Sequence, residues 1–224
     1  SSAASDVYKR QIVNNMKNLV IIGAGGMGRT LFDMAHGAIG YGTDFIIKGF
    51  IDDNQQALNG YNHYPSIISD IKSYLPFKDD LFICSMGGSV RKECMQRIID
   101  KGGEFFTMIH KTARIGTNVV LGKGNLIGAF TTIAADAVIG NYNFIQSYTI
   151  IGHDVKIGDW NRIDSHVMCI GGIVIQNEVM IHTSAVLNHN VVVESNSHIG
   201  ACSFVTRRVE QGTTVFGNPA RRLM

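Results

Sequence analysis

The sequence predicts two consecutive domains of different class, an α/β domain with a parallel sheet followed by an all-β domain built from a short repeat. Between residues 16 and 108, short apolar strands alternate with amphipathic helices. Between residues 109 and 224, an apolar residue recurs at every sixth position, a period of neither a helix nor an ordinary strand. Residues 1–15 have no apolar pattern and no initiating Met, and we interpret them as a disordered or expression-derived leader outside the fold.

Composition limits the classes of function. The chain has 224 residues, of which 45% are hydrophobic and 17% charged, so it can bury a substantial core. A formal net charge of +2 gives no reason to expect a nucleic-acid partner or an acidic membrane surface. No apolar run approaches the roughly 18 residues of a membrane span, and no secretory signal is recognisable. The four cysteines form no CxxC pair and are typical of reduced thiols, which predicts a cytoplasmic protein without membrane insertion: Cys84, Cys94, Cys169 and Cys202.

The first domain follows the order of a Rossmann-like α/β unit. Its expected elements are a strand at 18–23, a helix at 29–38, strands at 45–51 and 81–86, a helix at 89–102 and a strand at 104–109. Strands that alternate with helices form a parallel sheet with right-handed crossovers. About 90 residues provide one βαβ half, which favours a mononucleotide or a nucleotide-linked ligand over NAD.

A glycine turn stands between the first strand and the first helix. Gly23, Gly25 and Gly28 have the GxGxxG spacing, which lets the backbone approach a phosphate at a helix N-terminus; the alternative is a tight turn without a ligand. Asp52 and Asp53 follow the second strand and are either ligands of a base or ribose or a solvated turn. The candidate ligands of the nucleotide are therefore Gly23, Gly25, Gly26, Asp52 and Asp53, with Gly87, Gly88 and Arg91 as weaker candidates.

The second domain consists of uninterrupted hexads. Each short segment can bury its apolar anchor only by stacking on its neighbours, so a repeat of this regularity predicts a coiled parallel sheet. The anchors are Ile115, Leu121, Ile127, Ile133, Ile139, Ile145, Ile151, Ile157, Ile163, Cys169, Ile175, Ile181, Leu187, Val193, Ile199 and Val205.

These hexads resemble the left-handed parallel β-helix of the hexapeptide acyltransferases. With the preceding domain, the chain is similar to the bacterial sugar acyltransferases that include nucleotide-amino-sugar N-acetyltransferases and sialic acid O-acetyltransferases. The segments "VIIGAGGMG", "GFIDDN", "IGHDVKIGD" and "GNPAR" occur in the order of that family. The resemblance implies an all-β left-handed parallel β-helix with three hexads per eighteen-residue coil.

An eighteen-residue coil stacks one column of residues two positions past an anchor: Ala135, His153, Gly171, His189 and Arg207. Adjacent coils are about 4.8 Å apart, so His153 and the Gly171 backbone are predicted neighbours. Acetyl transfer needs a base and an oxyanion donor, roles that suit an imidazole and a backbone N–H at Gly171 or Gly172. In the family the histidine of the matching "GHD" motif is the base and the adjacent acidic residue increases its basicity, which implies these roles for His153 and Asp154.

The resemblance also implies an acetyl-CoA co-substrate, lying along the β-helix past Gly171, Gly172, Thr183, Gly200 and Ala201. Four arginines near the C-terminus either meet the CoA phosphates or form a solvated basic end: Arg207, Arg208, Arg221 and Arg222. Some family members have a second histidine nine residues after the first, where this chain has Arg162, and some have a histidine in the glycine turn at the position of Met27. These departures concern contacts with the acceptor sugar more than the reaction, and Arg162 becomes a candidate acceptor contact.

The preferred interpretation is an acetyl-CoA-dependent N-acetyltransferase acting on a nucleotide-linked amino sugar in bacterial surface glycan biosynthesis. The fold resemblance further implies a homotrimer, and no metal is expected. Alternatives with the same fold are a sialic acid-type O-acetyltransferase and a serine-type acetyltransferase. A zinc hydratase would need three converging histidines, such as His153, His182 and His189, and a nucleotide-sensing module would have no catalysis.

Overall fold

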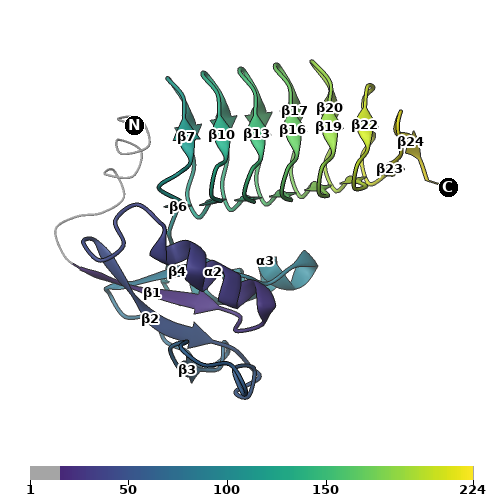
Figure 1. Ribbon diagram of the computed structural model, residues 1–224. Coiled ribbons are helices and arrows are strands. Elements are labelled where there is room, and N and C mark those ends of the chain that lie inside the picture. Colours follow the sequence, from purple (N-terminus) through teal and green to yellow (C-terminus); the bar gives the residue numbers. More distant parts are fainter. Residues whose placement is uncertain (1–15, 224) are drawn as a thin grey trace. The chain divides into compact units, whose positions relative to one another are not determined.

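The computed structural model describes residues 16–223 as two compact units, divided between Met108 and Ile109. Figure 1 shows both units, a sheet with helices and a long stack of coils. The leader that we expected at residues 1–15 lies outside the described residues. The two units are therefore described separately.

The first unit contains one five-stranded parallel sheet with strand order β3-β2-β1-β4-β5. Its strands are β1 (Lys17–Ile22), β2 (Phe45–Ile51), β3 (Ile67–Ser69), β4 (Asp80–Cys84) and β5 (Glu104–Phe105). Helix α2 (Gly26–His36) packs on β1, and helix α3 (Gly88–Ile99) packs on β5. The chain adds strands on one side of β1 and then continues at β4 on the other side, and the point between β1 and β4 is where open sheets of this kind bind ligands.

The last expected strand of this unit, residues 104–109, is in fact two strands. β5 pairs with β4, whereas β6 (Met108–Ile109) is the first strand of a sheet of the repeat region. The mostly apolar run at 104–109 hides this change, because both strands need buried side chains. The sequence interpretation also missed β3, which has only three residues and pairs with β2 through an irregular register.

The second unit is a parallel β-solenoid. Its two-residue strands pair with the strands eighteen residues earlier and later, as in Ile133–Ile151 and Ile151–Cys169, so the expected coil length is confirmed. Three sheets, here called faces 1, 2 and 3, run along the stack (Figure 1). Face 1 consists of β7 (Arg114–Ile115), β10 (Thr132–Ile133), β13 (Ile150–Ile151), β16 (Met168–Cys169), β19 (Val186–Leu187) and β22 (Phe204–Val205).

Faces 2 and 3 complete each coil. Face 2 consists of β8 (Val120–Leu121), β11 (Val138–Ile139), β14 (Lys156–Ile157), β17 (Val174–Ile175) and β20 (Val192–Val193). Face 3 consists of β6, β9 (Leu126–Ile127), β12 (Phe144–Ile145), β15 (Arg162–Ile163), β18 (Met180–Ile181), β21 (His198–Ile199), β23 (Thr214–Phe216) and the antiparallel β24 (Arg221–Arg222). We call the three residues after each strand of face 1 corner 1, and corners 2 and 3 follow faces 2 and 3 in the same way.

The hexad anchors form the core of the solenoid. Each anchor is the second residue of its strand and is buried, except Leu121 in the first coil, which is half-buried. From position 118 to position 202, the third residue of every corner has a positive φ, including bulky residues such as Tyr148 and Trp160. A left-handed conformation is costly for large side chains, and here they stack on one another along the corners. Trp160 lies on Tyr142 with ring centroids 4.4 Å apart and is not a core residue.

A ladder of buried asparagines runs inside the solenoid. Asn125, Asn143 and Asn161 are fully buried and occupy equivalent positions in three successive coils. The Oδ1 of Asn143 accepts hydrogen bonds from the backbone N–H and the side-chain amide of Asn161, at 2.9 and 3.0 Å. The Nδ2 of Asn143 donates to the Gly158 carbonyl at 2.9 Å, so the ladder satisfies buried backbone groups at the corners.

Candidate functional site

His153 and Asp154 lie at corner 1, immediately after β13. The Nδ1 atom of His153 is 2.7 Å from Oδ2 of Asp154, and both side chains are 64% exposed. Asp154 has φ +58°, which turns the chain at the corner and directs its carboxylate back to the imidazole. A carboxylate can only accept at this contact, so the imidazole places its proton on Nδ1 and leaves the Nε2 lone pair available.

The His153 ring lies over Gly171 in the next coil. A Cβ added at Gly171 would be 2.5 Å from both Cε1 and Nε2 of His153, so only glycine leaves room for the ring in this position. Gly172 donates its N–H to the His153 carbonyl at 2.9 Å. The Gly171 N–H has no acceptor among the residues that the structure describes, so it can donate to a ligand. The neighbouring position predicted for His153 and Gly171 is therefore the one observed.

In the first unit, the glycine turn has one packed part and one open part. A Cβ at Gly28 would collide with the Gly23 carbonyl, because α2 packs closely on the turn. Gly25 and Gly26 are exposed and have no protein atom closer than 3.9 Å to an added Cβ. Helix α2 starts after Gly25 without a side-chain cap and without an acidic residue in its first turn. Among the residues that the structure describes, the N–H groups at the start of this helix have no acceptor, as an anion site requires.

The two aspartates after β2 hold the loops around this turn. Asp52 accepts a hydrogen bond from the Ala24 N–H at 2.7 Å and another from the Asn54 N–H at 2.8 Å. Asp53 accepts from the Ile71 N–H at 2.9 Å. Both carboxylates thus have a structural role, which the sequence did not indicate, and each keeps lone-pair capacity for a ligand.

The weaker candidates lie at the next turn. Gly87 and Gly88 are the exposed N-cap and first residue of α3, which also has no side-chain cap, and Gly88 has φ +57°. Arg91 is buried, and its charge opposes the effect of burial, which raises the pKa of the Cys84 thiol to about 12. Gly87 and Gly88 are thus near the β1–β4 switch point, whereas Arg91 faces the interior.

The residues expected to hold CoA are distributed over two corners. Gly171 and Gly172 share corner 1 with His153, but Thr183, Gly200 and Ala201 lie at corner 3. The Phe216 ring covers Gly200 so closely that a Cβ there would collide with it. Within one chain, these residues do not form a single pocket, and packing alone explains the glycine at position 200.

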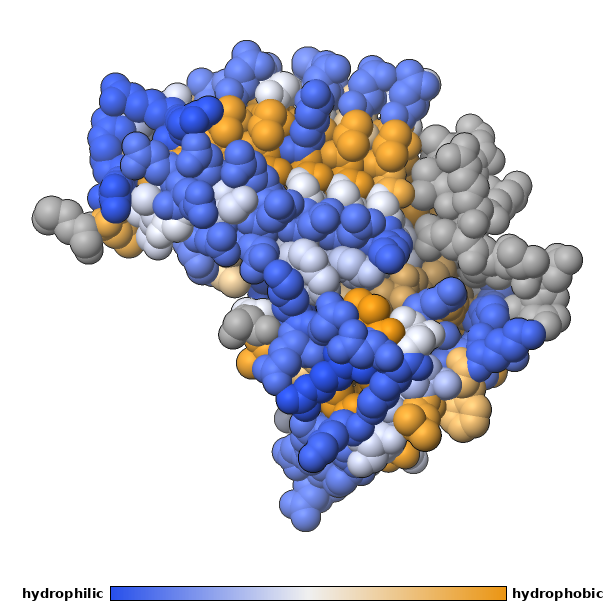
Figure 2. Space-filling model, turned by 180° about the vertical axis from the view of Figure 1, so that it is seen from behind, coloured by the Kyte–Doolittle hydropathy of each residue, from blue (hydrophilic) through white to orange (hydrophobic). Residues whose placement is uncertain are grey.

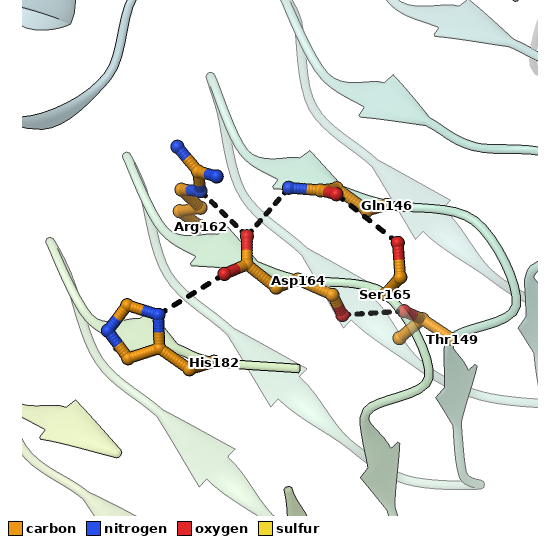
Figure 3. A network of polar contacts seen from close by, with 6 residues as sticks. All are labelled: Gln146, Thr149, Arg162, Asp164, Ser165 and His182. Atoms are coloured by element: carbon orange, nitrogen blue, oxygen red, sulfur yellow. Dashed lines mark hydrogen bonds and ion pairs between the residues drawn. The ribbon is translucent and has the colours of Figure 1, made fainter. Parts of the chain in front are cut away.

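Arg162 belongs to a polar network that the sequence interpretation missed. It lies on β15, and its Nε donates to Oδ1 of Asp164 at 2.7 Å. Gln146 and His182 contact the same carboxylate (Figure 3). The available signal was a column with eighteen-residue spacing in which Gln146, Asp164 and His182 follow their anchors directly, a position that many other hexads fill with glycine.

Four arginines line a pocket of about 270 Å³ at the end of the solenoid: Arg207, Arg208, Arg221 and Arg222. Arg208 pairs with Glu194 at 2.8 Å, and Arg222 lies 3.6 Å from Glu210. The pocket remains a candidate for phosphate groups.

His153 and His189 belong to corner 1 and His182 to corner 3, so the three histidines of the hydratase alternative do not converge within one chain. In the described part of the chain, no three His, Cys, Asp or Glu side chains are grouped as metal ligands. No helix between residues 16 and 223 is long and apolar enough to cross a membrane.

Two family models match different parts of the chain. Residues 18–98 match the family model of the PglD N-terminal domain, and residues 105–198 match the model of the GMPPB C-terminal domain. A UDP-N-acetylbacillosamine N-acetyltransferase of Bacillus subtilis (strain 168) is 29% identical over 119 residues, which are 51% of this chain and 52% of that protein. The chain thus matches about half the length of this curated relative.

Two solved structures cover nearly the whole chain. The acetyltransferase domain of PglB from Neisseria gonorrhoeae FA1090 has a TM-score of 0.82 at 25% identity and covers 92% of this chain and 100% of that chain. PerB from Caulobacter crescentus, in complex with CoA and GDP-perosamine, has a TM-score of 0.80 at 19% identity over 92% of this chain and 97% of that chain, a likeness of fold. The first unit is therefore similar to a PglD-type N-terminal domain, and nearly the whole chain is similar to the acetyltransferase domain of PglB.

Proposed function

We propose that this protein is an acetyl-CoA-dependent N-acetyltransferase whose acceptor is a nucleotide-linked amino sugar. The observation that carries the proposal is the His153–Asp154 pair, with the imidazole lying over Gly171. The PglB domain and the Bacillus subtilis relative are acetyltransferases by name, which supports the reaction. GDP-perosamine bound to PerB supports the class of acceptor.

The reaction follows from the free atoms at corner 1. The acceptor amine attacks the thioester carbonyl, and Nε2 of His153 takes the proton that the amine loses. The Gly171 N–H donates to the oxyanion of the tetrahedral intermediate. When the C–S bond breaks, the imidazolium returns the proton to the departing thiolate of CoA. Asp154 keeps the proton on Nδ1 and stabilises the imidazolium between these steps.

The first unit would hold the nucleotide as a Rossmann-like domain. The open backbone at Gly25 and Gly26 and the uncapped start of α2 would receive its diphosphate. Asp52 and Asp53 would use their remaining lone pairs for the base or ribose. Gly87 and Gly88 face the same switch point, and the glycine backbone there would allow close approach.

We also propose a left-handed solenoid that assembles as a homotrimer in the cytoplasm and serves bacterial surface glycan biosynthesis. Within one chain, the CoA candidates are divided between corners 1 and 3, and a neighbouring copy would bring such corners together. The outward row of face 2 is mostly apolar and includes the exposed side chains Val120 and Val138. Figure 2 shows hydrophobic surface along the repeat region, as a self-association face requires.

The test is a screen of nucleotide-linked amino sugars with acetyl-CoA, in which free thiol release is followed and the product is analysed by mass spectrometry. We expect one amino sugar to be acetylated at nitrogen. Hydroxyl-only analogues of the same nucleotide sugars serve as controls. Acetylation of the hydroxyl analogues or of free sialic acid would replace this proposal with an O-acetyltransferase, and absence of turnover with every acceptor would refute catalysis.

A further inference from the structure

A polar cluster at corner 3 surrounds a buried carboxylate. Gln146, Asp164 and His182 occupy one position in three successive coils, directly after the anchors of β12, β15 and β18. Asp164 is only 7% exposed. Its Oδ1 accepts from Gln146 Nε2 at 2.6 Å and from Arg162 Nε at 2.7 Å, and its Oδ2 is 3.2 Å from Nδ1 of His182 (Figure 3).

The fold itself does not require these polar side chains. The same position after an anchor is glycine in many hexads: Gly116, Gly122, Gly128, Gly140, Gly152, Gly158 and Gly200. A buried carboxylate loses hydration, and well-packed hydrophobic replacements of buried ion pairs are often neutral or stabilising. The cluster therefore needs an explanation other than the stability of the coil.

The contacts of Asp164 determine which atoms remain available to a ligand. A carboxylate in an ion pair with Arg162 can only accept, so His182 donates its Nδ1–H to Oδ2. The lone pair of His182 is then at Nε2, on the side of the ring away from Asp164 (Figure 3). Arg162 uses Nε for Asp164 and keeps its two terminal nitrogens, which have no other partner among the described residues. Both side chains reach the surface, with exposures of 31% for Arg162 and 40% for His182.

We infer that Asp164 is a positioning residue that makes His182 Nε2 a hydrogen-bond acceptor and the end of Arg162 a donor for the ring hydroxyls of the acceptor sugar. The inference rests on the proposed function and names a second contact region for its substrate. A hydroxyl both donates and accepts, so sugar hydroxyls match an acceptor beside a donor. A phosphate or carboxylate matches poorly, because its oxygens would meet the Nε2 lone pair and because Asp164 already neutralises Arg162.

Asp164→Asn tests this assignment because the change is nearly isosteric. Its amide oxygen can still accept from Arg162 and Gln146, but its NH2 group then faces His182 and requires Nδ1 to accept. The proton of His182 should move to Nε2, which would turn a hydrogen-bond acceptor into a donor. We expect the KM of the amino sugar to rise roughly tenfold, the usual effect of one lost hydrogen bond at its upper range, with an unchanged KM for acetyl-CoA.

The tautomer can be measured without any substrate. In protein labelled with 15N in the histidine rings, long-range proton–nitrogen spectra should show the His182 proton on Nδ1 in the wild type and on Nε2 in Asp164→Asn, with His182→Ala assigning the signals. Ser165→Ala is the matched control, since it removes a hydroxyl that contacts Gln146 at 3.2 Å without touching Asp164. This control should keep the wild-type tautomer and both KM values.

Several outcomes would overturn the inference. An unchanged tautomer in Asp164→Asn would remove the positioning role. A rise in the acetyl-CoA KM alone would assign the site to an amide of the CoA arm, and an equal rise in both KM values would indicate a general structural role.

If Asp164→Asn does not fold, His182→Gln replaces it: the amide restores a polar group near Nε2 and should keep a lower sugar KM than His182→Ala. Wild-type turnover with unchanged KM values in these variants would refute this inference and leave the proposed function standing. If the wild-type protein acetylates none of the acceptors tested, the proposed function itself is refuted.

Discussion

The glycine at position 171 is explained by a side chain in the preceding coil. His153 occupies the space that a Cβ at Gly171 would take, and its Nδ1 is held by Asp154 at 2.7 Å. Both side chains of the pair are well exposed, so the ring can move if it is displaced. At the scale of single residues, a missing side chain therefore determines where the candidate base stands.

Replacing the imidazole tests the base directly. We expect His153→Ala to lower kcat by on the order of 10²–10⁴, the usual contribution of a positioned base. Acetyl-CoA should still bind, because docking of the thioester does not use Nε2, and calorimetric titration measures this separately from turnover. The control is His166→Ala, another exposed corner histidine, which stacks on Tyr148 and should keep its activity. Full turnover in His153→Ala would exclude this residue as the base.

A methyl group at Gly171 should displace the base without unfolding the coil. We expect Gly171→Ala to lower kcat by roughly 10²-fold, since a displacement of about 1 Å at a reacting group has that effect. Thermal unfolding should change little, because the contact is with an exposed ring that can be displaced into solvent. Gly172→Ala is the contrasting variant: Gly172 has φ +72°, so alanine there should cost about 1 kcal/mol of stability or more. Undiminished kcat in Gly171→Ala would show that the observed ring position is not needed for catalysis.

At the scale of single elements, some glycines are required by close packing, whereas others leave open space at the surface. In the α2 turn, Gly28 is required by the close approach of the helix to Gly23, whereas Gly25 has open space around it. The φ of Gly25 is −69°, a conformation that other residues adopt easily. Inside the solenoid, the asparagine ladder satisfies backbone groups that hydrophobic side chains would leave unpaired.

Adding a charge at Gly25 should separate stability from binding. Asp and Asn are both good N-caps, so Gly25→Asp and Gly25→Asn should each stabilise the fold by a few tenths of a kcal/mol at most, or be neutral. Only the aspartate repels a diphosphate at the helix start, so the acceptor KM should rise about tenfold more in Gly25→Asp than in Gly25→Asn. Steady-state kinetics with both substrates measures the difference. Equal acceptor KM values for the two variants would mean that no anion binds at this turn.

The asparagine ladder should dominate the stability of the middle coils. We expect Asn143→Leu to lower the free energy of unfolding by on the order of 3 kcal/mol, because it leaves the Asn161 N–H and the Gly158 carbonyl without their partners. Urea unfolding followed by circular dichroism gives the value. Asn188→Leu, at a half-buried position outside the core, should change it by less than about 0.5 kcal/mol. Equal effects in both variants would deny the ladder a special role.

At the scale of the whole molecule, the residues of the proposed site lie on different corners of the solenoid. His153 belongs to corner 1, whereas Arg162, Thr183 and Ala201 belong to face 3 and corner 3. A second copy can bring these regions together, and the apolar row on face 2 offers a surface for it.

The proposed assembly can be tested by placing a charged side chain in the apolar outward row of face 2. Val138 is 42% exposed on face 2 and is followed in the next coil by Lys156, so Val138→Lys adds a second positive charge beside the first. We expect light scattering to give a trimer for the wild type and a smaller species with reduced turnover for Val138→Lys. Leu75→Lys, at a residue of the first unit that is 69% exposed, should leave both properties unchanged. A stable and fully active wild-type monomer would refute the trimer.

The sequence by itself determined the hexad repeat and which side chains of each hexad turn inward. In a repeat of six residues, the same position of every hexad turns its side chain inward, so the local sequence pattern specifies the overall fold. The eighteen-residue coil, taken from the family resemblance, then placed His153 beside Gly171, as observed. The glycine turn between the first strand and α2 was equally readable, because its spacing is local.

Only the tertiary structure decided the contacts between coils and between loops. Asp164 meets Gln146 and His182 across one coil each, and Phe216 covers Gly200 from a different strand. Asp52 and Asp53 hold backbone N–H groups 28 and 18 residues away. Such partners share no short-range pattern, since the chain must first close its loops before their side chains can meet. The sequence therefore specifies which residues face inward, whereas the packing of the coils determines which polar groups remain available for chemistry.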